Sequence, residues 1–432
     1  MAYVADGNDF EEAVENREHE LYIITTVPPD LGRVEWVTVL TLRACVELQA
    51  VPTLQWLREL YVSDCPALTT ICPQPALCAL ELERCPALVH LPGESPLERF
   101  VAHQCESIGC TPAARDVELT ACARLQLGPH ACTRSIVARD CRALARLPPG
   151  PRLVRAEFYG CPGLERVAPQ PVLAHLLLDG CGGVRFLPED MPALTTLLLT
   201  SYEGEKTALA YIPRYPQLVR LAVTGHPSLS RIRSQPRLVS LLLRRCPAPL
   251  PPALPCLTDL ILDAAGESLE KRVYPALVRL KLSHCSAGLQ VHPKLREVSV
   301  TGAQQWVAGL EQQPQLAALT LLDCAGFAAV PTCPRVVCME VRECHDVVDV
   351  GEQPGLVFLK LAWCGGVSRL ERRYERLAQL HVEMCPLFSA VEVQPRLRYV
   401  WWWGNARLPW NRVKGMFGYN RIGIDYLPPS DW

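Results

Sequence analysis

One group of residues in this sequence has the composition of a reactive centre. Cys344 is followed directly by His345 and Asp346, so a thiol stands beside a base and a carboxylate. A thiol next to a histidine is typical of a nucleophile that is activated by deprotonation. Such a role requires an accessible, electropositive position, because the thiolate is the reactive form. The elements that position Cys344 therefore decide whether it can react.

Two other groupings raise the question of zinc, namely Cys72 with Cys78 and Cys333 with Cys338. Neither pair has the C-x₂-C spacing of a zinc knuckle, and no second pair follows at finger spacing. We interpret these four residues as structural thiols on the convex side of the fold described below. The sequence predicts no metal and no other cofactor.

The cysteine positions follow from an internal repeat. Residues 57–96 contain two consecutive copies of L-x-x-L-x-L-x-x-C-P-x-L-x-x-L, each with a proline-containing tail. We call the cysteine that ends L-x-x-L-x-L-x-x-C the reference position and require apolar residues three and five positions before it. This pattern recurs in nineteen units, with reference residues Cys45, Cys65, Cys85, Cys105, Cys122, Cys141, Cys161, Cys181, Tyr202, His226, Cys246, Ala265, Cys285, Ala303, Cys324, Cys344, Cys364, Cys385 and Asn405. Fourteen of the 21 cysteines are reference residues, so their abundance reflects repetition and not a disulfide framework.

Over residues 31–409 the pattern resembles leucine-rich repeats, in which L-x-x-L-x-L-x-x-N/C forms a short strand and a turn. The resemblance implies a β-rich solenoid, a superhelix with parallel strands on its concave side. A twenty-residue unit has no room for a helix as well, and prolines such as Pro73 and Pro75 favour an extended, polyproline-like convex side. The units are similar to the short proline-containing repeats of bacterial effectors, with Cys in place of Asn.

This architecture argues against catalysis by Cys344. The reference cysteines point inward, and stacked parallel strands hold them side by side, so we expect free, buried thiols that act as small core residues. The C-x-D sequence resembles the active-site motif of ubiquitin ligases that carry bacterial leucine-rich repeats. In that family the motif lies in a separate helical domain, whereas only 23 residues follow the repeats here. The sequence predicts a protein that is not an enzyme.

The repeats divide the chain into three predicted parts. Residues 1–36 form an N-terminal cap, with a helix over residues 9–19 that begins at Asp9 with Glu12 three positions on, and a strand over residues 21–27. Residues 37–409 form the solenoid. Residues 410–432, rich in aromatic residues, form a C-terminal cap. The spacing of reference positions shortens to seventeen residues between Cys105 and Cys122 and lengthens to twenty-four between Tyr202 and His226.

The bulk composition limits the partners. The 43 basic and 45 acidic residues give a net charge of −2, so no overall field attracts nucleic acid or anionic lipid. No apolar segment reaches membrane-spanning length, and the N-terminus lacks the features of a signal peptide. Free thiols favour an intracellular, reducing compartment. A protein within a virion, or an effector in a host cell, would have the same features.

The outward centre of each strand lies four residues before the reference position. At this position Leu177, Leu198, Ala222, Leu242 and Ile261 are consecutive apolar residues. Such a stripe often marks a partner surface, although a tight arc or the side chain of Tyr202 would also shield it. We predict a protein-binding surface centred on Leu177, Leu198, Leu242 and Ile261, with Tyr159 and Lys281 at its rim and the inserted Glu203–Lys206 at one edge.

The predicted function is a non-enzymatic scaffold that binds a protein partner through the concave face. The first alternative is a structural subunit of a large assembly such as a virus particle. The second is the substrate-recognition part of a ubiquitin ligase system, with residues 1–36 as the contact to an adaptor. No nucleic acid and no membrane are expected as partners.

Overall fold

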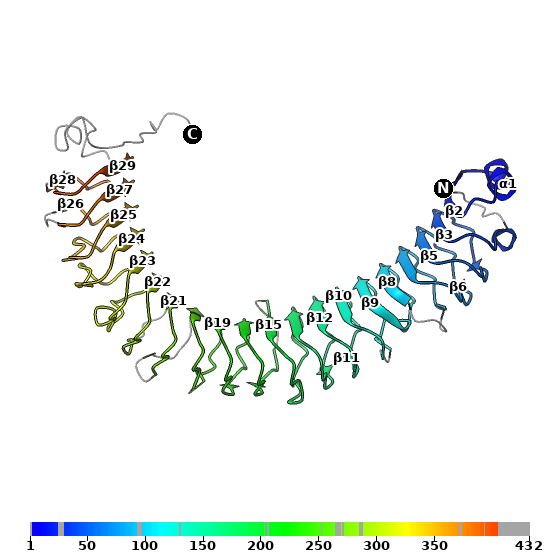
Figure 1. The fold of residues 1–432 in the computed structure, drawn as a ribbon, viewed down its shortest axis with the longest axis horizontal. Helices are drawn as coiled ribbons and strands as arrows, with labels where there is room; N and C mark the ends of the chain where they lie inside the picture. Colours follow the sequence, from blue (N-terminus) through cyan, green and yellow to red (C-terminus); the bar gives the residue numbers. More distant parts are fainter. Residues whose placement is uncertain are drawn as a thin grey trace. The chain divides into compact units, whose positions relative to one another are not determined.

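The computed structural model describes residues 2–24, 30–92, 97–128, 131–202, 204, 207–251, 253–263, 269, 272–284, 288–370, 374–392 and 394–404. Its fold is a β-solenoid of about 18 turns with parallel strands, which confirms the predicted fold class (Figure 1). Contacts between residues group the chain into two compact units, Met1–Gln235 and Pro236–Trp432. We call these the first and the second unit, and each has its own set of strands.

The elements of the first unit are β1 (Ala2–Val4), α1 (Gly7–Glu15), β2 (Glu20–Ile24), η1 (Leu31–Arg33), β3 (Val39–Arg43), β4 (Ala50–Val51), β5 (Glu59–Ser63), β6 (Thr70–Ile71), β7 (Ala79–Glu83), β8 (Leu97–His103), β9 (Ala114–Thr120), β10 (Ser135–Arg139), β11 (Arg146–Leu147), β12 (Arg155–Tyr159), β13 (Arg166–Val167), β14 (His175–Asp179), β15 (Thr196–Thr200), β16 (Tyr211–Ile212), β17 (Arg220–Thr224) and β18 (Arg231–Ile232).

Those of the second unit are β19 (Ser240–Arg244), β20 (Asp259–Asp263), β21 (Arg279–Ser283), β22 (Glu297–Thr301), β23 (Ala318–Leu322), β24 (Cys338–Arg342), β25 (Phe358–Ala362), β26 (Arg369–Leu370), β27 (Gln379–Glu383), β28 (Ala390–Val391) and β29 (Tyr399–Trp403).

Each unit has two faces. The longer strands form one face, which we call the strand face, and the two-residue strands lie on the other, which we call the back face (Figure 1). The back face is built from turns, extended chain and the short parallel pairs β4–β6, β11–β13, β16–β18 and β26–β28. In the described residues α1 and η1 are the helical elements, so the prediction of an extended back face is confirmed. The short parallel pairs were not predicted.

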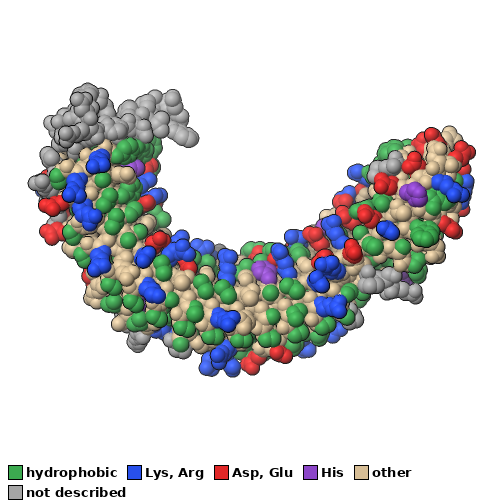
Figure 2. Space-filling view, in the orientation of Figure 1, with side chains coloured by type: hydrophobic (Ala, Val, Ile, Leu, Met, Phe, Trp, Pro, Cys, Tyr) green, Lys and Arg blue, Asp and Glu red, His purple; other side chains and the backbone are tan. Residues whose placement is uncertain are grey.

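The strands form because apolar residues alternate with polar ones at the strand period. Every strand from β3 to β29 on the strand face ends two residues before a predicted reference position. Leu60 and Val62 in β5 are 0% and 2% exposed, while Tyr61 between them is half-buried on the strand face. Leu60 is opposite Leu80 in the parallel pair of β5 with β7, so the inward residues stack from one turn to the next. Acidic and basic side chains lie side by side along the strand side of the first unit (Figure 2).

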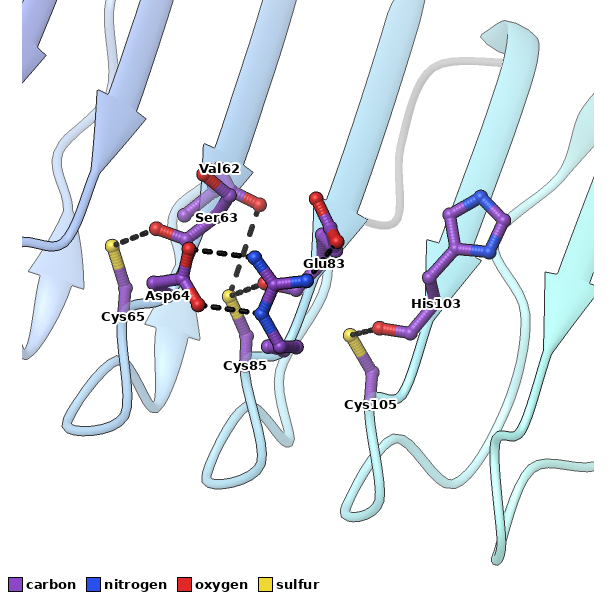
Figure 3. Close-up of polar contacts among 9 residues, drawn as sticks. Val62, Ser63, Asp64, Cys65, Glu83, Cys85, His103 and Cys105 are labelled. Atoms are coloured by element: carbon purple, nitrogen blue, oxygen red, sulfur yellow. Dashed lines mark hydrogen bonds and ion pairs between the residues drawn. The ribbon is translucent and has the colours of Figure 1, made fainter.

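Most strands on the strand face end in a tight turn that contains a reference cysteine. In every described repeat except the one with Ser201, the residue before the reference position has a positive φ. Many of these residues are not glycine, among them Asp64 (56°) and Arg84 (50°). This left-handed residue turns the chain so that the thiol reaches a carbonyl two residues earlier. Cys65 donates to Ser63 O at 3.3 Å and Cys105 to His103 O at 3.4 Å (Figure 3).

The thiols themselves form the predicted ladder. All thirteen reference cysteines in the described residues are buried and free, as predicted, and Cys285 lies outside the described residues. Cys85 donates to Val62 O of the preceding repeat at 3.9 Å, so a ladder thiol also connects neighbouring turns (Figure 3). Burial raises the pKa of the Cys246 thiol, which keeps it protonated.

A second ladder, of buried glutamines, holds the back face. Gln170 is 0% exposed, accepts from Gly150 N at 2.9 Å and donates to Pro148 O at 2.7 Å. These bonds satisfy two backbone groups of the preceding repeat that its prolines and turn leave without strand partners. The same arrangement occurs at Gln74, Gln235, Gln313 and Gln353. In one repeat of the second unit His292 takes this place and its Nδ1 accepts from Tyr274 N at 3.2 Å, and burial lowers the pKa of His292.

The N-terminal region contains the predicted helix and strand, with different starts. The helix α1 begins at Gly7 and not at Asp9, because Asp6 caps it: its Oδ1 accepts from Asn8 N at 2.8 Å and from Asp9 N at 3.0 Å. Asp9 closes the capping box by accepting from Asp6 N at 3.2 Å. The predicted strand over residues 21–27 is observed as β2, and residues 25–29 lie outside the described residues.

The two repeats of unusual length differ in structure. Where the spacing shortens to seventeen residues, β8 and β9 each contain seven residues and pair from Leu97 and Ala114 onward, so longer strands replace part of the back. Where the spacing lengthens, the reference residue Tyr202 does not point inward as the reference cysteines do, because it is 56% exposed. A phenol is too large for a cysteine site. The ring lies instead against Gly180, where a Cβ atom would be 2.8 Å from it.

No helix in the described residues combines the length and the apolar character needed to cross a membrane.

Candidate partner-binding surface

The predicted site residues of the first unit lie on adjacent strands of its strand face. Leu177 in β14 is directly opposite Leu198 in β15, and Leu198 is opposite Ala222 in β17. All three side chains are half-buried. Tyr159, at the end of β12, lies one strand away and is also half-buried. The structure therefore brings Tyr159, Leu177 and Leu198 together within the first unit.

A buried carboxylate lies beside these apolar residues. Glu157, opposite Leu177, is only 5% exposed although it occupies the outward centre of β12. Its Oε1 accepts from Arg155 Nε at 2.9 Å and lies 3.0 Å from His175 Nε2, and its Oε2 accepts from the Tyr159 hydroxyl at 3.1 Å. A buried charge of this kind is tolerated because its lone pairs are satisfied.

The charged contacts continue away from the leucines. The Arg139 guanidinium lies 5.3 Å from the centre of the Tyr159 ring and forms an ion pair with Glu118 at 2.8 Å. Burial, and then Glu157, raises the pKa of Tyr159, so the phenol stays protonated and can donate. Together these residues fix a polar border beside the leucines in a defined geometry.

At the carboxyl ends of the strands the leucine pair is bordered by Tyr202 and by Asp179, the last residue of β14 and the register partner of Tyr159. The Tyr202 hydroxyl donates to Asp179 Oδ2 at 3.2 Å, so this tyrosine reaches the strand face from the turn after β15. Of the predicted edge loop Glu203–Lys206, only Gly204 is among the described residues, and the other three lie outside them.

The other predicted site residues belong to the second unit. Leu242 in β19 is opposite Ile261 in β20, and Ile261 is opposite Lys281 in β21. Leu242 and Ile261 are half-buried, and Lys281 is exposed. Ion pairs border this group, because Asp259 pairs with Arg279, and Asp263 lies 3.5 Å from Arg244 Nε. The second unit thus has an apolar pair of its own, with one exposed cation beside it.

An aromatic group at the last strands of the second unit was missed by the sequence analysis. The His381 ring has its centre 5.0 Å from that of Phe358, 5.5 Å from that of Tyr399 and 5.9 Å from that of Trp401. Burial, followed by the charge of Lys360, lowers the pKa of His381. Part of the signal was present, since His381 and Trp401 are opposite one another at the central strand position. Phe358 and Tyr399 are the first residues of their strands, a position that was not considered.

The cysteines considered for chemistry differ in burial. Cys344 is 0% exposed, and its thiol donates to Arg342 O at 3.2 Å. A hydrogen bond with the Cys324 thiol, and then burial, raises its pKa, which disfavours the thiolate. Cys72 and Cys78 are partly exposed and Cys333 is buried. Within the described ranges no three His, Cys, Asp or Glu side chains are grouped as metal ligands would be.

One prediction about these thiols is wrong. Cys338 was assigned to the convex side, but it is the first residue of β24, opposite Ala318 and Phe358 on the strand face. Its distance of six residues from the reference Cys344 places it at an outward strand position.

Comparisons with known proteins do not assign this chain to a family. No protein-family model matches the sequence, and no curated protein sequence matches it. A solved complex of TLR13 with ssRNA13 has a TM-score of 0.47 and 11% identity, over 94% of this chain and 87% of that chain. YopM from Yersinia enterocolitica has a TM-score of 0.35 and 17% identity, over 96% and 93% of the two chains. A leucine-rich repeat protein from Bacteroides ovatus has a TM-score of 0.29 and 12% identity, over 86% and 88%. The fold assignment therefore rests on the parallel register of the chain's own strands.

Proposed function

We propose that this protein is a non-enzymatic scaffold that binds a protein partner through its strand faces. The observation that carries the proposal is the half-exposed pair Leu177 and Leu198, aligned on adjacent strands beside a polar border that is already hydrogen-bonded. Apolar residues surrounded by polar ones are the usual centre of a protein–protein contact. In this reading residues 1–36 cap the first turn, while the predicted C-terminal cap, residues 410–432, lies outside the described residues.

Preorganisation supports a binding role. Glu157 and Tyr159 are fixed by contacts within the first unit, so little side-chain freedom is lost when a partner covers them. The parallel backbone ladder holds Leu177 and Leu198 in register in the same way. A partner would gain burial of these leucines without having to reorganise the surface.

The second unit offers an independent contact of the same kind. Leu242 and Ile261 supply the apolar centre, and exposed Lys281 supplies a cation beside it. We propose that this group also contacts protein. Because the two groups belong to different units, their contributions are tested one at a time.

The experiment begins with affinity purification and mass spectrometry to identify the partner. Its affinity is then measured for Leu198→Ser, Leu242→Ser and the double variant. Removing two central apolar side chains should cost about 2 kcal/mol or more, which is roughly a thirty-fold loss of affinity. Each single variant reports on one unit. Glu81→Gln is the control and should cost much less, because Glu81 lies on β7, outside the polar border.

A different pattern would support the structural-subunit alternative. If partner binding or assembly survives Leu198→Ser/Leu242→Ser but fails when residues 410–432 are removed from a still-folded protein, the strand faces are not the contact. Capture of a ubiquitin-conjugation component that depends on residues 1–36 would support the ligase alternative.

A further inference from the structure

The back face of the first unit contains a cavity that the strand-face proposal does not use. Its volume is about 910 Å³, and it lies over the short parallel strands β11 and β13. The cavity walls come from four successive repeats, between Leu127 and Pro188. A volume of this size is typical of sites that enclose a small ligand or a few side chains.

Three arginines surround this cavity. Arg146 and Arg166 are directly opposite one another in β11 and β13, and Arg185 comes from the next repeat. All three are exposed, and within the described ranges none has a carboxylate at ion-pair distance. Glu165 is the one acidic residue of the lining, which leaves a net charge of +2 around the cavity. Adjacent like charges repel one another, so this arrangement costs stability unless an anion is present.

The interior of the cavity is apolar. Leu147, Val167 and Leu187 form buried parts of the wall, and Pro148, Pro149 and Pro188 complete it. Phe186, opposite Arg166 across a single β-bridge, is 66% exposed. A large aromatic side chain with this exposure beside an apolar cavity is a common feature of recognition sites. The cavity therefore combines an apolar floor with a basic rim.

We propose that this cavity binds a short, extended, acidic segment of a partner protein, which inserts an apolar side chain between carboxylates that pair with Arg146, Arg166 and Arg185. Charge complementarity selects the acidic character, because guanidinium groups bind carboxylates through paired hydrogen bonds. The aliphatic and proline floor selects an apolar side chain. Arg146 and Arg166 sit on adjacent strands, about 4.8 Å apart, so one extended segment can reach both.

The same features favour a peptide over a nucleic acid. Single strands are bound by several aromatic rings on which successive bases stack. Here Phe186 is the one aromatic residue of the lining, and the floor is aliphatic. The site is separate from the strand face, so its occupancy and the strand-face contact can fail independently.

The test uses the full chain and a fluorescein-labelled peptide, Glu-Asp-Leu-Glu-Asp-Leu-Glu, followed by fluorescence anisotropy. Three other probes are matched to it: one with amides in place of all carboxylates, one with Ser in place of Leu, and a single-stranded oligonucleotide. The variants are Arg146→Glu/Arg166→Glu and Phe186→Ala. Arg231→Glu is the control, because Arg231 is exposed, lies on β18 and is outside the cavity. Thermal melting confirms that each variant is folded.

We expect saturable binding of the acidic probe. Its affinity should fall about ten-fold or more in Arg146→Glu/Arg166→Glu and should change less than about two-fold in Arg231→Glu. The amide and serine probes should each bind less tightly than the parent peptide, and Phe186→Ala should weaken the parent. Absence of binding up to about 1 mM probe would overturn the proposal. So would equal losses in the cavity and control variants, which indicate unspecific charge attraction. Tighter binding of the oligonucleotide through the same arginines would replace the peptide by a nucleic acid.

Discussion

The strand face and the back face of the first unit use arginine in opposite ways. On the strand face Arg139 pairs with Glu118, and Arg155 pairs with buried Glu157. On the back face Arg146, Arg166 and Arg185 surround a cavity without a carboxylate at ion-pair distance in the described part of the chain. These strand-face charges are paired within the protein, so recognition there falls to the apolar side chains. The back face leaves its charges available to an outside group.

The two faces differ because different side chains lie opposite one another on their neighbouring strands. On the strand face the parallel ladder brings Arg99 opposite Asp116, and Glu118 reaches Arg139 on the next strand. On the back face the parallel pairing places two residues of the same charge, Arg146 and Arg166, opposite one another. When repeats have equal length, the same position of successive repeats forms a column of side chains. The residues in that column decide whether it is neutral or charged.

The largest effect on stability should come from placing a charge on the inward side of a strand, compared with the same charge on its outward side. Leu178 in β14 is 4% exposed, and its neighbour Leu177 is half-buried on the strand face. Leu178→Asp places an unpaired charge in the core and should cost about 3–5 kcal/mol, whereas Leu177→Asp should cost less than about 1 kcal/mol. Urea unfolding followed by circular dichroism measures both. Equal stability of the two variants would show that the inward assignment is wrong.

Sequence reasoning located the strands because their signal is local and periodic. Alternating residues such as Leu60 and Val62, with a cysteine at a fixed distance, determine which side chains point inward. The same period also placed the reference cysteines in the core. Tyr202 holds a reference position but is exposed, because counting positions takes no account of side-chain volume.

Other features could not be found in this way. A positive φ at Asp64 or Arg84 is imposed by the turn and opposes the preference of the residue itself. The glutamine ladder consists of polar residues before proline, a composition that also suits an exposed loop. Whether an arginine is paired depends on neighbours twenty residues away, and the sequence analysis grouped only the central strand position across repeats. The back-face cavity therefore came from the structure alone.

A second, smaller effect should come from the buried glutamines that hold the back face. Gln170→Ala leaves Gly150 N and Pro148 O without their partner and should destabilise the protein by about 2–3 kcal/mol. Gln49→Ala, a change of an exposed glutamine in the same unit, is the matched control and should have little effect. Thermal unfolding of the two variants gives the comparison. Hydrogen exchange at Gly150 should rise in Gln170→Ala only, and an unchanged rate there would contradict the proposed clamp.

The smallest effect tests the contrast between the faces directly, by removing one arginine from each. Arg155→Ala on the strand face takes a partner from the Glu157 carboxylate, which stays buried beside His175 and Tyr159. The loss should be about 1 kcal/mol, because the Arg155 side chain is 57% exposed and solvent screens the pair. Arg166→Ala on the back face removes a charge that repels Arg146, so stability should stay within about 0.5 kcal/mol of the parent or rise slightly. Raising the salt concentration should reduce the difference between the two variants, since added ions screen both the attraction and the repulsion. If Arg166→Ala proves the more destabilising change in chemical denaturation, the back-face arginines have a structural role and are not left free for a partner.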